Sequence, residues 1–158
     1  MGPSFRFLYR DSEGAIGPGV WARASALPVA VALLMTLIAW AIAPRAPRDL
    51  GEQPFFSWSI FAVHAYLLVY GFALIFCAVA QYFVSAKRYN DLGKPQALGG
   101  LAPFLLMLAG AANWYQPRSE GAMPLWAVYP FDALAVAVVV WSIVELGFMR
   151  RAPGASEP

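Results

Sequence analysis

Long apolar runs alternate with short polar segments along the chain. Within its 158 residues, the apolar runs cover 24–43, 60–83, 97–115 and 125–148. A helix needs roughly 20 apolar residues to cross a hydrocarbon core of about 30 Å. The pattern therefore predicts an all-α integral membrane protein whose four transmembrane helices form a compact bundle.

The third run is the least regular of these. Gly99 and Gly100 weaken the start of a helix, and Pro103 has no backbone N–H to donate. If Pro103 lies in the first turn, where that N–H would be unpaired anyway, the continuous helix is about 15 residues long. Such a helix could be less tilted than the others, kinked or partly re-entrant.

The first run has an alternative interpretation as a cleaved signal peptide, because Ala41, Ile42 and Ala43 resemble a cleavage site. Pro44 would directly follow the cut, where proline is poorly tolerated, and the segment before the run would be an n-region of 23 residues. Both features favour an uncleaved span. The predicted organisation is then a segment 1–23, a transmembrane domain 24–148 and a tail 149–158, with short turns over 45–57 and 116–124.

The distribution of cations predicts the orientation of the spans. Eight Lys and Arg residues flank one side and three flank the other. The first group is Arg6, Arg10, Arg23, Lys87, Arg88, Lys94, Arg150 and Arg151, and the second is Arg45, Arg48 and Arg118. Since cytoplasmic segments carry the excess of Lys and Arg, both termini and the central segment are expected in the cytoplasm.

Composition agrees with a membrane protein and excludes some functions. The chain is 60% hydrophobic and 13% charged, whereas soluble domains carry about 25% charged residues. The net charge is only +2 and no basic stripe is present, so we expect no nucleic-acid partner. Cys77 is the only cysteine, which excludes an intramolecular disulfide and a cysteine metal cage, and we expect it to be a buried apolar residue.

The segment AKRYNDLGKPQALGG, residues 86–100, concentrates charge between two apolar runs. Asn90, Asp91, Gly93 and Pro95 favour a turn, because Asn and Asp bond nearby backbone and Gly accepts a positive φ. We therefore expect a structured loop that follows the second span.

Two roles are open for the charges of this segment. In the first, Asp91 pairs with Arg88 or Arg23, while Lys87 and Lys94 face anionic lipid headgroups. In the second, the cations only keep the loop in the cytoplasm.

The segment resembles the signature Arg-Arg-Leu-His-Asp-x-Gly-Lys/Arg-Ser-Gly-Trp of a bacterial inner-membrane family called domain of unknown function 805. The matching positions are Lys87, Arg88, Asp91, Gly93 and Lys94, and Asn90 replaces the histidine. Members are similar in size, with four predicted helices and this motif after the second. The resemblance implies a divergent member in a bacterial inner membrane, and the family has no established activity to transfer.

Polar side chains inside the spans are candidate functional residues, because they are costly in hydrocarbon. His64 and Asp132 lie at similar depths from the outer ends of the second and fourth spans, and Asn113 could join them in one polar cluster. The alternative is hydrogen bonding that only holds helices together. Near the inner ends, Gln81 and Glu145 form a second candidate pair, although Glu145 could instead bond Arg88, Arg150 or Arg23.

The sequence contains no nucleophile, metal set or phosphate loop in a recognisable arrangement. We therefore expect a protein that is not an enzyme and has no cofactor, and that acts as an accessory subunit, an adaptor or an envelope-homeostasis factor. Its expected partners are membrane lipids, with anionic headgroups among them, and a membrane protein or a second copy of the chain. The alternative is a transporter of small solutes, protons or ions, or an oligomeric pore.

Overall fold

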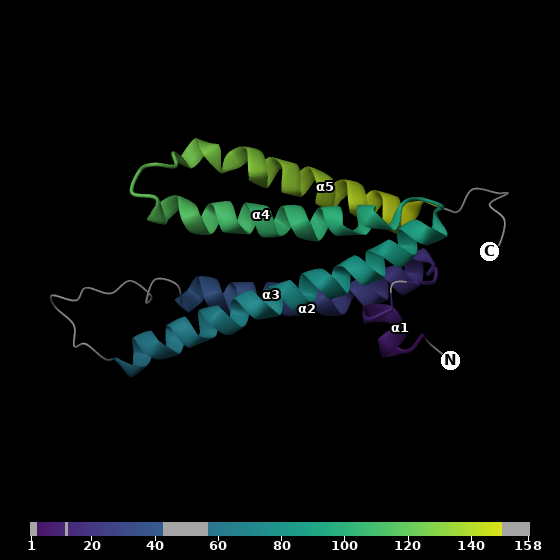
Figure 1. The fold of residues 1–158 in the computed structure, drawn as a ribbon, viewed down its shortest axis with the longest axis horizontal. Coiled ribbons are helices and arrows are strands. Elements are labelled where there is room, and N and C mark those ends of the chain that lie inside the picture. Colours follow the sequence, from purple (N-terminus) through teal and green to yellow (C-terminus); the bar gives the residue numbers. More distant parts are fainter. Residues whose placement is uncertain (1–2, 12, 43–56, 150–158) are drawn as a thin grey trace.

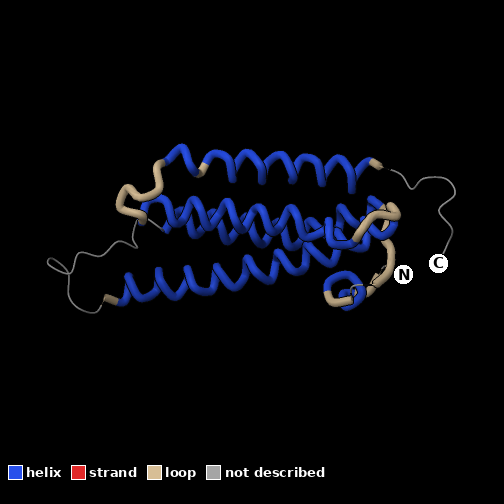
Figure 2. The backbone as a smooth tube through the Cα atoms, turned by 45° about the horizontal axis from the view of Figure 1, so that its top comes forward, coloured by secondary structure: helices blue, strands red, loops and turns tan. Residues whose placement is uncertain are grey.

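The fold is known from a computed structural model, which describes residues 3–11, 13–42 and 57–149. These residues form helices joined by turns and irregular segments, and they include no strand (Figure 2). The elements are α1 (Phe5–Tyr9), α2 (Pro18–Ile42), α3 (Trp58–Asp91), η2 (Gln96–Gly100), α4 (Leu101–Tyr115), η3 (Gln116–Arg118), η4 (Leu125–Ala127) and α5 (Tyr129–Phe148). The predicted all-α class is confirmed.

Within the described residues, four helical segments are long and apolar enough to cross a membrane: Pro18–Ile42, Trp58–Asp91, Gln96–Arg118 and Leu125–Phe148. Each contains one of the four predicted runs almost completely. The first three are longer than the runs that predicted them, because helical hydrogen bonding continues through residues, polar ones among them, that hydropathy alone excludes.

The helices form two antiparallel hairpins, α2 with α3 and α4 with α5 (Figure 1). The hairpins meet where α2 begins and where α3 and α5 end, and α1 lies beside the same end. The helix α3 is inclined to the others, so its first turns lie away from the α4–α5 hairpin.

The central segment differs from the loop that was predicted. Residues 87–91 belong to the last turns of α3, which is 34 residues long. The turn begins only at Leu92, where the N–H of Lys94 donates to the carbonyl of Tyr89 at 2.9 Å. Gly93 has a φ of +71°, which confirms the predicted left-handed turn position.

The third span agrees with its predicted length. The helix α4 has 15 residues, with Pro103 as its third residue, where a missing N–H costs no helical bond. Gly99 and Gly100 continue the helical path as the 3₁₀ helix η2 instead of loosening it. Gly99 is buried against α3.

Burial is concentrated at the end where the hairpins meet. The buried apolar core consists of Ile16, Trp21, Ala24, Val84, Tyr89 and Leu146. Away from this end, many large apolar side chains are exposed, as expected for helices whose solvent is lipid. Cys77, predicted to be buried, is only half-buried.

Replacing Gly99 by alanine is expected to destabilise the fold by about 1–3 kcal/mol through overpacking. A Cβ at this position would lie 2.6 Å from the backbone nitrogen of Ala86, and a backbone atom cannot move aside. A thermal-unfolding scan in mild detergent measures the effect.

The neighbouring residue is the matched control. A Cβ at Gly100 would lie 3.5 Å from the Tyr82 ring, an ordinary contact, so Gly100→Ala should unfold like the parent. Equal melting temperatures for the two variants would contradict the close packing of η2 on α3.

Candidate functional site

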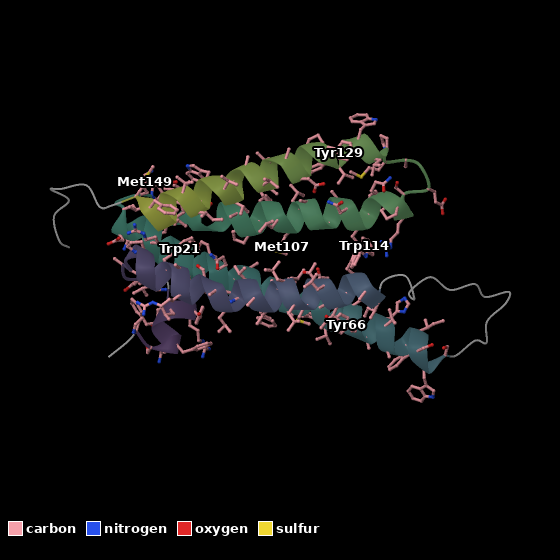
Figure 3. The ribbon with its side chains drawn as sticks, turned by 180° about the vertical axis from the view of Figure 1, so that it is seen from behind. Trp21, Tyr66, Met107, Trp114, Tyr129 and Met149 are labelled. Carbon is pink, nitrogen blue, oxygen red and sulfur yellow. The ribbon has the colours of Figure 1, made fainter. Side chains whose placement is uncertain are left out.

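Three consecutive residues of the motif at 87–94 are buried at the end of α3. Lys87 and Tyr89 are 0% exposed and Arg88 is 1% exposed. Figure 3 shows Trp21 and Met149 at this end of the molecule, and Trp114 and Tyr129 at the opposite end. We call Lys87, Arg88, Asn90, Asp91, Lys94 and Glu145 the polar junction.

Arg88 connects α3 to the end of α5. Its Nε donates to the carbonyl of Leu146 at 2.9 Å, and its guanidinium also donates to the carbonyl of Met149. The last carbonyls of a helix lack intrahelical partners, and a cation there interacts favourably with the helix dipole. The same guanidinium forms an ion pair with Asp91, which confirms the predicted pairing.

Lys87 connects α3 to the amino-terminal segment. Its Nζ donates to the carbonyl of Asp11, and longer bonds of 3.4 Å reach the carbonyls of Leu8 and Phe83. The Nζ also lies 5.3 Å from the centre of the Phe7 ring. The prediction that Lys87 faces lipid headgroups is therefore wrong, because its side chain is buried and its Nζ bonds backbone carbonyls, two of them in the amino-terminal segment.

Lys94 and Glu145 form the second ion pair of the polar junction. The Glu145 side chain is 1% exposed and that of Lys94 is 43% exposed. The hydroxyl of Tyr89 donates to Glu145 at 3.4 Å. A buried carboxylate needs a counter-charge, and Lys94 provides it. Because the Lys94 side chain is also partly exposed, its contact with headgroups stays a prediction.

The predicted pair of Gln81 and Glu145 is not formed. The Gln81 amide donates to the Ser25 hydroxyl at 3.0 Å and to the Ser85 hydroxyl at 3.3 Å. The indole of Trp21 donates to the same Ser85 hydroxyl at 3.3 Å. This serine-centred link between α2 and α3 was missed from the sequence, because small polar residues inside apolar runs give no distinctive signal.

Two further bonds attach the amino-terminal segment. The Asn90 amide donates to the carbonyl of Gly14 at 2.9 Å, and the Tyr9 hydroxyl donates to the carbonyl of Ala24 at 2.8 Å. Burial raises the pKa of the Tyr9 phenol, because it disfavours the charged phenolate. Gly14 has a φ of +107°, and a Cβ there would lie 2.7 Å from the Phe7 ring.

At the opposite end of the helices, the structure forms only part of the predicted polar cluster. The Asn113 amide donates to Asp132 at 2.7 Å and to the carbonyl of Ala109 at 3.0 Å. His64 is exposed on α3, and its Nδ1 lies 2.9 Å from the carbonyl of Ile60. Because α3 leans away from α5 at this end, His64 does not join the pair (Figure 1).

The interactions of the polar junction connect segments of the chain to one another. Its cations are bonded to carboxylates or to backbone carbonyls of the chain itself. Across the described ranges 3–11, 13–42 and 57–149, no three His, Cys, Asp or Glu side chains are placed to hold a metal ion. What the arrangement does is join the amino-terminal segment, the end of α3 and the end of α5.

Replacing Lys94 by methionine should destabilise the protein by about 3 kcal/mol, since the buried Glu145 carboxylate loses its counter-charge. The double variant Lys94→Met, Glu145→Met removes both charges and should recover most of the lost stability. Chemical or thermal unfolding in detergent measures both.

If the pair of Lys94 and Glu145 acted as a solvent-exposed ion pair, it would contribute little to the free energy of unfolding. In that case, Lys94→Met would change the stability by less than about 1 kcal/mol, and the double variant would show no recovery. That result would contradict the buried pairing of Glu145.

No protein-family model, no curated protein and no solved structure matches this chain. The residues and their contacts therefore carry the functional argument. The residues that the structure describes form an all-helical fold with four helices able to span a membrane, and the polar junction joins the ends of α3 and α5 to the amino-terminal segment.

Proposed function

We propose that this chain is a non-catalytic accessory or adaptor protein of a bacterial inner membrane. One observation carries the proposal: the three cations of the polar junction, Lys87, Arg88 and Lys94, all bond groups of the chain itself. The polar groups hold the helices together, which leaves apolar helix faces as the main surface for contacts with other molecules.

The proposed topology places the polar junction and both termini in the cytoplasm. The excess of Lys and Arg on this side supports it, as do Arg10 and Arg23, which are exposed at the same end. The junction joins both hairpins, which supports a four-helix bundle in the bilayer. The bacterial inner membrane and the relation to domain of unknown function 805 rest on the motif of residues 87–94.

The exposed helix faces are suited to contacts between helices within lipid. On α2, Leu33 and Leu34 are 60% exposed and Leu37 is 63% exposed. Gly71 on α3 and Gly110 on α4 are also exposed, and no atom lies within 4 Å of a Cβ built at either. Small residues on such faces let the backbone of another helix approach closely.

Site-specific crosslinking in cells tests the adaptor role. A photoreactive amino acid is placed at Leu34, Leu68, Leu108 or Val140, one exposed position on each long helix. We expect one membrane protein, or a second copy of the chain, to be captured from one or two adjacent faces and to copurify in a constant ratio.

The control is a comparison of the proteins captured at each of the four positions. Equal capture of many proteins from every face indicates random collisions, and no capture from any face indicates a protein surrounded by lipid alone. Either result would contradict the proposed adaptor role.

A transport function is the second candidate, and the pair of Asn113 and Asp132 between α4 and α5 is the observation that favours it. A carboxylate inside a membrane segment is often part of an ion pathway. If the chain is an adaptor, purified protein in sealed liposomes conducts no more protons than empty liposomes. Proton flux that is lost in Asp132→Asn and kept in the control Glu120→Gln, which changes an exposed turn, would establish transport instead.

A further inference from the structure

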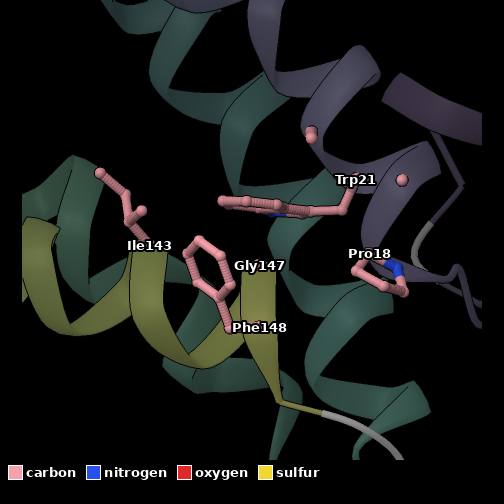
Figure 4. Close-up of a pocket in the computed structure, with 7 residues that line it drawn as sticks. Pro18, Trp21, Ile143, Gly147 and Phe148 are labelled. Carbon is pink, nitrogen blue, oxygen red and sulfur yellow. The ribbon is translucent and has the colours of Figure 1, made fainter.

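An apolar groove lies at the end of the molecule that carries the polar junction. It has a volume of about 450 Å³ and separates the first turns of α2 from the last turns of α5 (Figure 4). The lining residues are Pro18, Gly19, Trp21, Ala22, Ile143, Gly147 and Phe148. Its size is in the usual range of small-molecule sites, which are mostly apolar with a few polar groups at the edge.

The walls of the groove present carbon surface. Figure 4 shows Trp21 reaching from α2 toward α5, where Ile143 and Phe148 form the opposite wall. The only polar atom of the indole, Nε1, donates to Ser85 at 3.3 Å and is therefore already used inside the protein. An aliphatic chain can lie against this wall without leaving a polar group unpaired.

The rim of the groove carries a positive charge. Arg23 is exposed, and its Nε donates to the carbonyl of Gly19, a lining residue, at 3.0 Å. This bond places the guanidinium beside the carbonyl of Gly19 at the edge of the groove, and Arg23 forms no ion pair with any residue that the structure describes. The carboxylate of Glu145 on α5 does not offset the charge, because it is buried and paired with Lys94.

We propose that the groove binds an acidic phospholipid, with one acyl chain against Trp21 and Phe148 and the phosphate at Arg23. An apolar channel with a cation at its edge matches a molecule that is apolar along its length and anionic at one end. The groove lies where helices end, which is the depth at which a headgroup meets its acyl chains. This inference requires membrane insertion but does not depend on the adaptor role.

Two substitutions test the binding of the acyl chain and the binding of the headgroup separately. Gly19→Leu fills the groove without a clash, because no atom lies within 4 Å of a Cβ at Gly19, and leucine favours the helix. Arg23→Gln removes the charge and keeps a side chain of similar length. The matched control is Gly71→Leu, since Gly71 is equally open but lies on α3 outside the groove.

Native mass spectrometry of the purified protein in detergent measures lipid retention, with dioleoyl phosphatidylglycerol and dioleoyl phosphatidylcholine as probes. We expect the parent and Gly71→Leu to retain the anionic lipid about fivefold better than the neutral one. Gly19→Leu should lose both lipids by a similar factor. Arg23→Gln should bind both lipids equally, at the level of the neutral lipid in the parent.

Three results would overturn the proposal. Equal retention of both lipids by the parent indicates a site for neutral lipid, and equal retention by Gly19→Leu and Gly71→Leu places the lipid elsewhere. An unchanged anionic preference in Arg23→Gln assigns the headgroup to another cation. Melting temperatures of all variants, measured without lipid, show whether a loss of binding comes from unfolding, and an unfolded Gly19→Leu is replaced by Ala22→Leu, which fills the same groove.

Discussion

The bonding of the buried Arg88 guanidinium to the end of α5 is the interaction on which the rest of the structure depends. Arginine stays charged in proteins, so its removal from water requires acceptors on every side. The carbonyls at the end of α5 equally lack donors, because no further turn of helix follows them. Arg88 satisfies both needs at once, and in doing so it holds the end of α3 against the end of α5.

The other members of the polar junction extend this constraint along the chain. Lys87 bonds carbonyls of the amino-terminal segment, Asn90 bonds Gly14, and Lys94 neutralises Glu145 on α5. A buried ion pair adds little net stability over apolar packing, yet removing one partner is costly. The junction therefore specifies which helix ends meet more than it strengthens the fold, and lipid can solvate the apolar faces beyond it.

The same cations support the proposed orientation and join the helices. Their number on one side of the spans is the basis of the proposed cytoplasmic location, and their bonds inside the protein join the hairpins. Because those bonds occupy Lys87, Arg88 and Lys94, the cations left for lipid at this end are exposed residues such as Arg23. An adaptor role on the helix faces and a lipid at the groove can therefore coexist on separate surfaces.

The sequence by itself determined the features that depend on local chemistry. Hydropathy located the four long helices, Pro103 placed the start of α4, and Gly93 marked the turn after α3. Tertiary structure alone decided that Lys87 is buried and Lys94 pairs with Glu145, that Gln81 bonds Ser25 in place of Glu145, and that His64 stays apart from Asp132. The physical reason is distance along the chain: a helix or turn depends on near neighbours, whereas the partner of a charge is set by which helix ends pack together.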